Sequence, residues 1–237
     1  MKTAYLFDVD GTLTPSRRQI DPDFSKFFFD FVCTHDVYLV TGSDYPKTVE
    51  QIGNSLCCMV KRVYGCSGND VYKKGINVYT SDWIIPAEPF DWLNAKLKAS
   101  EFPLRTGNHF ENRPGMLNFS VVGRNATMGE RKLYVEWDER TNERNDIVDE
   151  FNALYGDTIT ATAGGETGLD IYPTGKDKSQ IIDDFSEYDK IFFFGDRCDP
   201  QGNDYTLARA VSALSGQGKY YNVEGWVHTW HILEEIT

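Results

Sequence analysis

Three short apolar runs in the chain each end abruptly in polar residues. Tyr5 to Phe7, Val37 to Val40 and Ile191 to Phe194 have the composition of buried strands. We interpret them as strands of a parallel sheet. Because ligands bind at the carboxyl edge of such a sheet, the polar residues that follow these strands are the first candidates for a functional site.

Apolar residues recur at helical spacing between these runs. Asp21 and Pro22 supply a cap and a first-turn proline, and the apolar face behind them predicts a helix that packs on the sheet as core. Further helices are expected around Ile181 to Phe185, through Leu207 and Val211, and from about Trp226. Residues 71–79 have the pattern of a hairpin at the edge of the core.

The pattern changes between residues 82 and 175. Ser81 to Pro89 has the composition of a linker, and strand and helix patterns then alternate irregularly, which favours an antiparallel sheet covered by helices. The expected helices lie around Trp92 to Leu97, Glu130 to Trp137 and Asn142 to Tyr155, and the expected strands at Met116 to Val122, Ile159 to Thr162 and Leu169 to Tyr172. We therefore predict a core domain made of residues 1–81 and 176–237, with residues 82–175 inserted as a cap domain.

Composition limits the possible partners. The 237 residues are 41% hydrophobic, enough to bury a core, and the net charge of −12 argues against nucleic acid or an anionic membrane, because no basic stripe offsets it. No apolar run approaches the ~20 residues that a membrane span needs, and we expect no signal peptide. The five cysteines are odd in number and lack metal-type spacing, so we expect reduced thiols in a cytoplasmic protein.

Acidic and polar side chains follow the predicted strands. Asp8 and Asp10 lie one residue apart after the first strand, close enough to share a divalent cation while one attacks a substrate and the other moves a proton. An acidic turn of this kind is often only solvated. Ser43 follows the second strand at a helix start, where phosphate binds well but where an N-cap serine is also common. Lys178 begins a later helix, and Asp196 follows the third strand.

The order Asp8-x-Asp10-Gly-Thr, Ser43, Lys178 and Gly195-Asp196 resembles the haloacid dehalogenase superfamily of phosphotransferases. This resemblance implies a Rossmann-like α/β core with an inserted α+β cap. Asp196 would be a metal ligand, with Asn203 and Asp204 as auxiliary ligands, and Lys178 would bridge the nucleophile and the transferring phosphoryl group.

The cap segment narrows the resemblance. Arg113-Pro-Gly-Met-Leu-Asn-Phe-Ser-Val-Val-Gly-Arg124, Arg131 seven residues on, and Gly-Gly-Glu-Thr-Gly-Leu-Asp170-Ile-Tyr-Pro are similar to the eukaryotic-type phosphomannomutases. The cap is also rich in arginine, whose fork suits bidentate phosphate binding, although surface ion pairs explain Arg140 and Arg144 better.

That family resemblance implies interconversion of mannose 6-phosphate and mannose 1-phosphate for GDP-mannose synthesis, with Mg²⁺ and a hexose 1,6-bisphosphate activator. Asp8 would be the nucleophile and Asp10 the general acid and base, with Mg²⁺ on Asp8, the Asp10 carbonyl and Asp196. Ser43 and Lys178 would bind the phosphoryl group in transfer. The residues matched to distal-phosphate and sugar positions are Arg17, Arg113, Arg124, Arg131, Gly168 and Asp170. The family also implies a homodimer through the caps.

Two other functions stay open on the residues alone. A Mg²⁺-dependent sugar-phosphate phosphatase would need only that water reach the aspartyl phosphate, and a binding protein could keep the fold without the chemistry. The chain departs from the family pattern at Thr41, Gly168, Lys176 and Cys198. These departures bear on the preferred sugar and on efficiency, since none removes a group that the chemistry needs.

Overall fold

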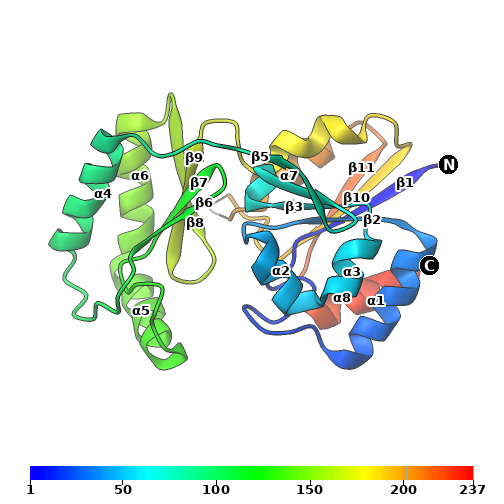
Figure 1. The fold of residues 1–237 in the computed structure, drawn as a ribbon, viewed down its shortest axis with the longest axis horizontal. Coiled ribbons are helices and arrows are strands. Elements are labelled where there is room, and N and C mark those ends of the chain that lie inside the picture. The colour runs from blue at the N-terminus through cyan, green and yellow to red at the C-terminus, as the bar shows by residue number, and fades with distance from the viewer. Residues whose placement is uncertain (201, 237) are drawn as a thin grey trace. The chain divides into compact units, whose positions relative to one another are not determined.

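The computed structural model describes residues 1–200 and 202–236. The chain divides into two compact units, one formed by residues 1–81 with 176–237 and the other by residues 82–175 (Figure 1). We call them the core unit and the cap unit. None of the helices in the described part of the chain is long and apolar enough to cross a bilayer.

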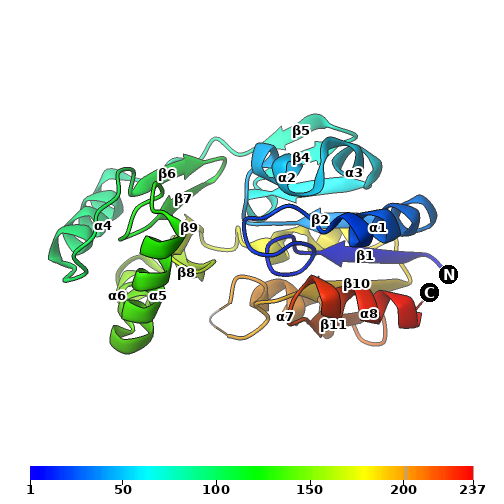
Figure 2. The same ribbon diagram turned by 90° about the horizontal axis from the view of Figure 1, so that it is seen from below.

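The core unit is built on a seven-stranded sheet with the order β11-β10-β1-β2-β3-β4-β5 (Figure 2). Its strands are β1 (Thr3–Phe7), β2 (Asp36–Val40), β3 (Arg62–Gly65), β4 (Asp70–Lys73), β5 (Ile76–Thr80), β10 (Lys190–Gly195) and β11 (Gly218–Asn222). The five strands from β11 to β3 are parallel, and the β4–β5 hairpin adds an antiparallel edge. The carboxyl ends of β1, β2 and β10 therefore lie side by side.

Helical elements cover both faces of this sheet (Figure 1). One layer contains α1 (Pro22–Thr34), α2 (Tyr45–Ile52), α3 (Asn54–Met59) and α8 (Trp226–Ile236), and the other contains η2 (Lys178–Phe185) and α7 (Tyr205–Ala213), with the short turn η1 (Cys66–Gly68) beside η2. Strand β1 serves both layers, because Tyr5 and Phe7 pack with the first and Ala4 and Leu6 with the second. Burial on both faces fixes the position of the end of β1, which the candidate nucleophile Asp8 directly follows.

Helix α1 begins as its sequence predicts. The Asp21 carboxylate accepts hydrogen bonds from the backbone N–H groups of Asp23 and Phe24, at 2.9 and 3.2 Å, and Pro22 occupies the first turn. The buried face behind this cap carries Phe24, Phe28, Phe31 and Val32.

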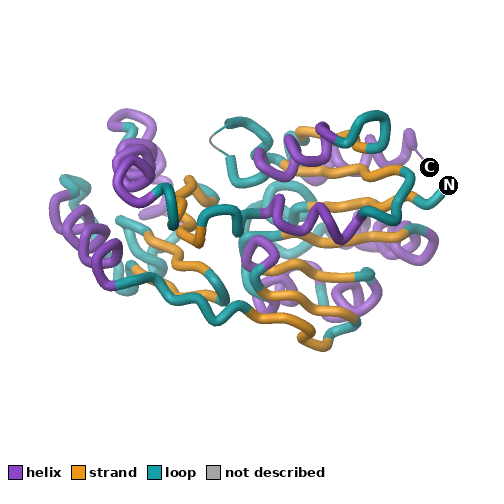
Figure 3. Tube along the Cα trace, turned by 90° about the horizontal axis from the view of Figure 1, so that it is seen from above, coloured by secondary structure: helices purple, strands orange, loops and turns teal. Residues whose placement is uncertain are grey.

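The cap unit is an antiparallel sheet with helices on one face (Figure 3). The strand order is β6-β7-β9-β8, with β6 (Phe110–Arg113), β7 (Met116–Phe119), β8 (Ile159–Gly164) and β9 (Gly168–Pro173); the helices are α4 (Ala87–Ala99), α5 (Met128–Thr141) and α6 (Glu143–Tyr155). Leu117, Phe119, Leu169 and Ile171 belong to the apolar core of this unit. The alternate residues of the same strands form the opposite, polar face.

The parallel α/β core and the helix-covered antiparallel sheet confirm the predicted fold class. Four details differ from the sequence expectations. Strand β7 ends at Phe119 and not at Val122, η2 is a 3₁₀ helix, and strands β6 and β11 had no counterpart in the predicted pattern. The sequences of β6 and β11, FENR and GKYYN, contain no apolar run. These two strands therefore form because they pair with neighbouring strands, and not because of their local sequence pattern.

The cap of α1 makes a stability prediction. Replacement of Asp21 by Ala leaves the Asp23 and Phe24 N–H groups without their carboxylate acceptor, so we expect the free energy of unfolding to fall by about 1 kcal/mol. Urea denaturation followed by circular dichroism measures this change. Asp30→Ala, on the exposed side of the same helix, is the matched control and should have little effect. Equal losses in the two variants would mean that the cap contributes nothing specific.

Candidate active site

A buried lysine between two aspartates lies at the carboxyl edge of the core sheet. Lys178 Nζ donates to Asp8 Oδ1 at 2.5 Å and to Asp204 Oδ1 at 2.7 Å. The side chains of Lys178 and Asp204 are fully buried and Asp8 is 4% exposed. Asp8 continues β1, and its N–H donates to the carbonyl of Phe194 in β10 at 2.9 Å. The ammonium group of Lys178 therefore connects the end of β1, the start of η2 and the turn before α7, which are far apart in the sequence.

Burial and charge shift the ionisation of this group. Burial raises the pKa of Asp8, and the nearby carboxylates of Asp204 and Asp196 raise it further, while Lys178 opposes both. Burial by itself would lower the pKa of Lys178, but Asp204 and Asp8 outweigh it and raise that pKa, so the ammonium keeps its proton. The site is an acidic pocket with one internal cation.

Asp196 completes a cluster of three carboxylates. Ligand oxygens of Asp8, Asp196 and Asp204 all lie within 4.8 Å of one another. Gly11, with φ of 81°, lets the first loop pass close to Asp196, because a Cβ at Gly11 would lie 2.3 Å from Asp196 Oδ2. Burial, followed by the charge of Asp204, raises the pKa of Asp196 to about 7. A set of hard oxygen donors with excess negative charge fits Mg²⁺.

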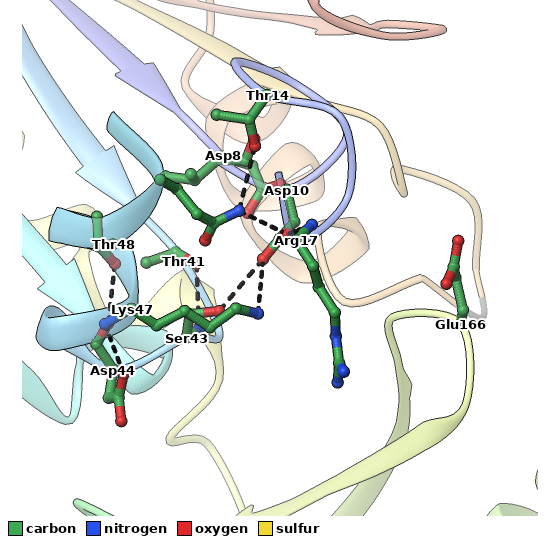
Figure 4. A network of polar contacts seen from close by, with 12 residues as sticks. Asp8, Asp10, Thr14, Arg17, Thr41, Ser43, Asp44, Lys47, Thr48 and Glu166 are labelled. Carbon is green, nitrogen blue, oxygen red and sulfur yellow. Dashed lines mark hydrogen bonds and ion pairs between the residues drawn. The ribbon is translucent and has the colours of Figure 1, made fainter. Parts of the chain in front are cut away.

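The Asp10 side chain has its own set of hydrogen-bond donors (Figure 4). Its oxygens accept from the Arg17 N–H at 2.7 Å, Gln51 Nε2 at 2.9 Å and Ser43 Oγ at 3.2 Å, and Lys47 Nζ lies 3.5 Å away. Burial favours the protonated form, but Lys47 and these hydrogen bonds outweigh it and lower the pKa of Asp10. Two carboxylates separated by one residue thus have opposite pKa shifts, because their surroundings differ.

Ser43 is not the cap of α2. Asp44 takes that position, where its carboxylate accepts from the Lys47 N–H at 3.0 Å, so the Ser43 hydroxyl is left to face Asp10. Thr41 accepts the Ser43 N–H at 3.0 Å through Oγ1 and so fixes the turn. Sequence analysis did not single out Lys47 and Gln51. Their spacing of four residues on the helix that follows Ser43 was the available signal.

A hydrogen bond joins Arg197 and Asp204 after strand β10. Asp204 Oδ2 accepts the Arg197 N–H at 3.1 Å, so this carboxylate holds the loop as well as Lys178. Asn203 is half-buried beside it. Cys198 is buried, and burial raises the pKa of its thiol, which keeps the thiol protonated near the carboxylates. A cavity of about 700 Å³, lined by Gly11, Asp196 and the start of α8, opens beside this loop within the core unit.

Three arginines of the cap unit have carboxylate partners: Arg113 on β6, Arg124 in the loop after β7, and Arg131 on α5. Glu111 bridges Arg113 and Arg124, contacting Arg124 Nη2 at 3.0 Å, and Arg113 Nη1 lies 4.0 Å from Asp170 Oδ1. Burial and the neighbouring charge of Arg113 lower the pKa of Arg124. Arg131 is buried and pairs with Glu166, Nη2 to Oε2, at 3.2 Å. Three guanidinium groups of the cap unit thus lie against carboxylate partners.

The strand register aligns polar residues across the cap sheet. Asn118 on β7 lies opposite both Glu111 on β6 and Asp170 on β9. Its amide Nδ2 donates to Asp170 Oδ1 at 2.7 Å, and its Oδ1 is buried without a protein partner. Gly168 borders this amide, since a Cβ there would lie 2.9 Å from Asn118 Nδ2. Asn118 therefore orients Asp170, a role that sequence analysis missed.

The remaining predicted residues lie elsewhere. Arg17 belongs to the core unit, where its backbone in the left-handed region (φ of 57°) directs its N–H to Asp10. Lys176 is exposed, and its carbonyl accepts from Asn69 and Gln180. Arg144 pairs with Asp138 at 2.7 Å, and Arg140 Nε donates to the Glu136 carbonyl at 3.1 Å. Arg140 and Arg144 are thus occupied on the helices of the cap.

The fold places this chain in a known structural class. It superposes on a haloacid dehalogenase-like hydrolase from Bacteroides thetaiotaomicron with a TM-score of 0.59 at 13% identity, covering 100% of both chains. It also superposes on the C-terminal domain of the C. albicans trehalose-6-phosphate phosphatase, with a TM-score of 0.64 at 13% identity, covering 95% of this chain and 80% of that one. The chain thus has the fold of the haloacid dehalogenase superfamily.

Sequence comparison is more specific. Residues 24–217 match the family model of eukaryotic phosphomannomutase. The chain is 31% identical over 209 residues to the phosphomannomutase of Spinacia oleracea, covering 85% of this chain and 84% of that one. It is 32% identical over 214 residues to phosphomannomutase 1 of Homo sapiens, covering 85% and 81%. The chain belongs to the eukaryotic phosphomannomutase family.

The raised pKa of Asp196 predicts how metal binding depends on pH. The metal-free folded carboxyl holds its proton up to about pH 7, above the ordinary value of 3.8, so this group lowers the free energy of unfolding as pH rises through that range. Binding of Mg²⁺ must displace the proton. We expect affinity to rise about tenfold from pH 6 to pH 8, with proton release at pH 6. Isothermal titration in two buffers measures both, and a pH-independent affinity would contradict the assignment.

Proposed function

We propose that this protein is a phosphomannomutase that interconverts mannose 6-phosphate and mannose 1-phosphate through an aspartyl phosphate on Asp8. The observation that carries the proposal is the group of arginines Arg113, Arg124 and Arg131 in the cap unit, in a chain of this family whose core unit holds the Asp8–Lys178–Asp204 group. A mutase must hold a bisphosphorylated sugar at both ends. A phosphatase does not need a second anion site.

Asp8 is the proposed nucleophile. Its phosphorylated form transfers the phosphoryl group to the free hydroxyl of the sugar phosphate. Asp10 takes the proton of that hydroxyl as the hydroxyl attacks, and returns it to the leaving oxygen when the reaction runs in reverse. The lowered pKa keeps Asp10 ionised and therefore able to accept this proton. Lys178 and Ser43 stabilise the negative charge of the phosphoryl group in transfer. The permanent ammonium of Lys178 already touches the attacking carboxylate.

The donor set supports Mg²⁺ as the cofactor. We propose Asp8, the backbone carbonyl of Asp10 and Asp196 as ligands, with Asn203 and Asp204 in auxiliary positions. When bound, Mg²⁺ supplies the positive charge that offsets the clustered carboxylates and the incoming phosphate. A hexose 1,6-bisphosphate is the proposed activator, because it phosphorylates Asp8 before the first turnover.

The distal end of the sugar phosphate is assigned to the guanidinium groups of Arg17, Arg113, Arg124 and Arg131. Asp170 is proposed to accept hydrogen bonds from the sugar hydroxyls. Its carboxylate is held in orientation for this by the hydrogen bond from Asn118. Gly168 has no hydroxyl to offer at its position, so more of the sugar recognition falls on Asp170.

A Mg²⁺-dependent sugar-phosphate phosphatase is the second candidate. The observation in its favour is that the cap arginines are already matched by carboxylates, Glu111, Asp170 and Glu166, which weakens the site for a second phosphate. The chemistry at Asp8 would be the same up to attack by water. A cytoplasmic location, a homodimer through the caps and a place in GDP-mannose synthesis remain predictions from the composition and the family.

An assay with two products tests the proposal. The protein is incubated with mannose 1-phosphate, Mg²⁺ and a catalytic amount of glucose 1,6-bisphosphate, and mannose 6-phosphate and free phosphate are both measured. We expect isomerisation with little phosphate release, and loss of both activities in Asp8→Asn, because the amide cannot become phosphorylated. Phosphate release without a need for the bisphosphate would support the phosphatase instead.

Arg131→Ala tests the distal site. Loss of a buried guanidinium that binds phosphate is expected to raise the KM for mannose 1-phosphate by about 10- to 100-fold. Arg131→Lys keeps the positive charge but loses the two-pronged guanidinium. Its KM for mannose 1-phosphate should lie between those of wild type and Arg131→Ala. Arg140→Ala, an arginine bound to a helix carbonyl in the same unit, is the control. Unchanged mutase kinetics in a folded Arg131→Ala would remove Arg131 from the site.

A further inference from the structure

The pairing of Arg131 with Glu166 joins a buried cation to an exposed anion. The Arg131 side chain is 5% exposed and the Glu166 side chain is 48% exposed, with 3.2 Å between Nη2 and Oε2. Arg131 Nε is buried and has no hydrogen-bond partner. The guanidinium is therefore only partly satisfied by protein acceptors, and Nη2 is the donor for which a phosphate oxygen would compete with Glu166.

Glu166 is placed to leave this contact easily. It lies in the turn between β8 and β9, where Gly165 adopts a left-handed conformation with φ of 54°. Glu111 is different, because it sits within strand β6 and contacts both Arg113 and Arg124. Rotation of the exposed Glu166 side chain into water costs little, whereas Arg131 remains where the fold buries it.

Charge explains why such a contact matters. Arg113, Arg124 and Arg131 face Glu111, Asp170 and Glu166, so the three guanidinium groups are balanced by three carboxylates. A phosphate dianion arriving at a balanced cluster gains little net attraction. Removal of the movable carboxylate leaves the cluster with a positive charge that the phosphate can neutralise.

We propose that Glu166 is a displaceable counter-ion that competes with the distal phosphate of the substrate for Arg131. The inference rests on the proposed function and adds its regulation: the site opens only for a ligand whose phosphate binds Arg131 better than Glu166 does. Glu166 also shields Arg131 whenever the distal phosphate leaves, as it must when a bisphosphorylated intermediate turns end for end. The contact multiplies the affinity by the fraction of protein in which Arg131 is free, and so lowers it whenever that fraction is below one.

The test compares Glu166→Gln with wild type in the full-length protein with Mg²⁺. Binding of mannose 6-phosphate and of glucose 1,6-bisphosphate is measured by isothermal titration, together with KM and kcat for the mutase reaction. We expect Glu166→Gln to bind both ligands about three- to tenfold more tightly, with a lower KM. A residue with only a structural role would not improve binding when it is removed.

Two further variants sharpen the comparison. Glu150→Gln makes the same change of charge in the cap unit at a carboxylate that contacts Lys96 and none of the clustered arginines, and its affinities should equal those of wild type. Glu166→Asp keeps the charge but shortens the reach, and we expect an affinity between those of wild type and Glu166→Gln. Thermal melting with and without ligand shows that each variant folds, and gives an independent measure of the gain in affinity.

Unchanged or weaker binding by folded Glu166→Gln, in a protein whose wild type isomerises mannose 1-phosphate, would overturn the counter-ion proposal and leave the proposed function intact. An equal gain in Glu150→Gln would overturn it too, because the effect would then come from net charge alone. A wild type that neither isomerises nor binds hexose phosphates would instead refute the proposed function itself.

Discussion

The fully buried ammonium of Lys178 is the constraint on which the core depends. A buried charge is tolerated only when partners satisfy it, and here Asp8 and Asp204 do so at 2.5 and 2.7 Å. Those partners come from the end of β1 and from the turn before α7, while the lysine begins η2. The ion pairs therefore hold together the segments that contain the candidate nucleophile and the candidate metal ligands. The stability of the fold and the arrangement of the site rest on the same contacts.

Two aspartates separated by one residue acquire different chemistry from this arrangement. Asp8 turns into the buried cluster, where burial and the other carboxylates raise its pKa. Asp10 turns toward Ser43, Gln51 and Lys47, and its pKa is lowered. The seven-stranded sheet makes the separation possible because β2 and the helix after it supply the second set of donors. The cap applies a similar principle to arginine, since strand pairing brings Glu111, Asn118 and Asp170 into one row beside the guanidinium groups.

Much of this was accessible from the sequence because it depends on local patterns. The apolar runs before Asp8 and Asp196 predicted strands, and the spacing of the phenylalanines after Asp21 predicted the face of α1. The order of the motifs identified the family resemblance, which the match to residues 24–217 now supports. These inferences succeed because hydrophobic periodicity and capping are properties of neighbouring residues. Strands β6 and β11 were not predicted, because their formation depends on pairing with neighbouring strands and not on their own composition.

The sequence by itself determined the class of fold, the family and the types of residue available for phosphoryl transfer. Only the tertiary structure decided which of them meet. It joined Lys178 to Asp204, gave Lys47 and Gln51 to Asp10, set Asn118 against Asp170 and paired Arg131 with Glu166. The physical reason is that an electrostatic contact falls off with distance in space, and sheet pairing and chain reversal set that distance independently of separation along the chain.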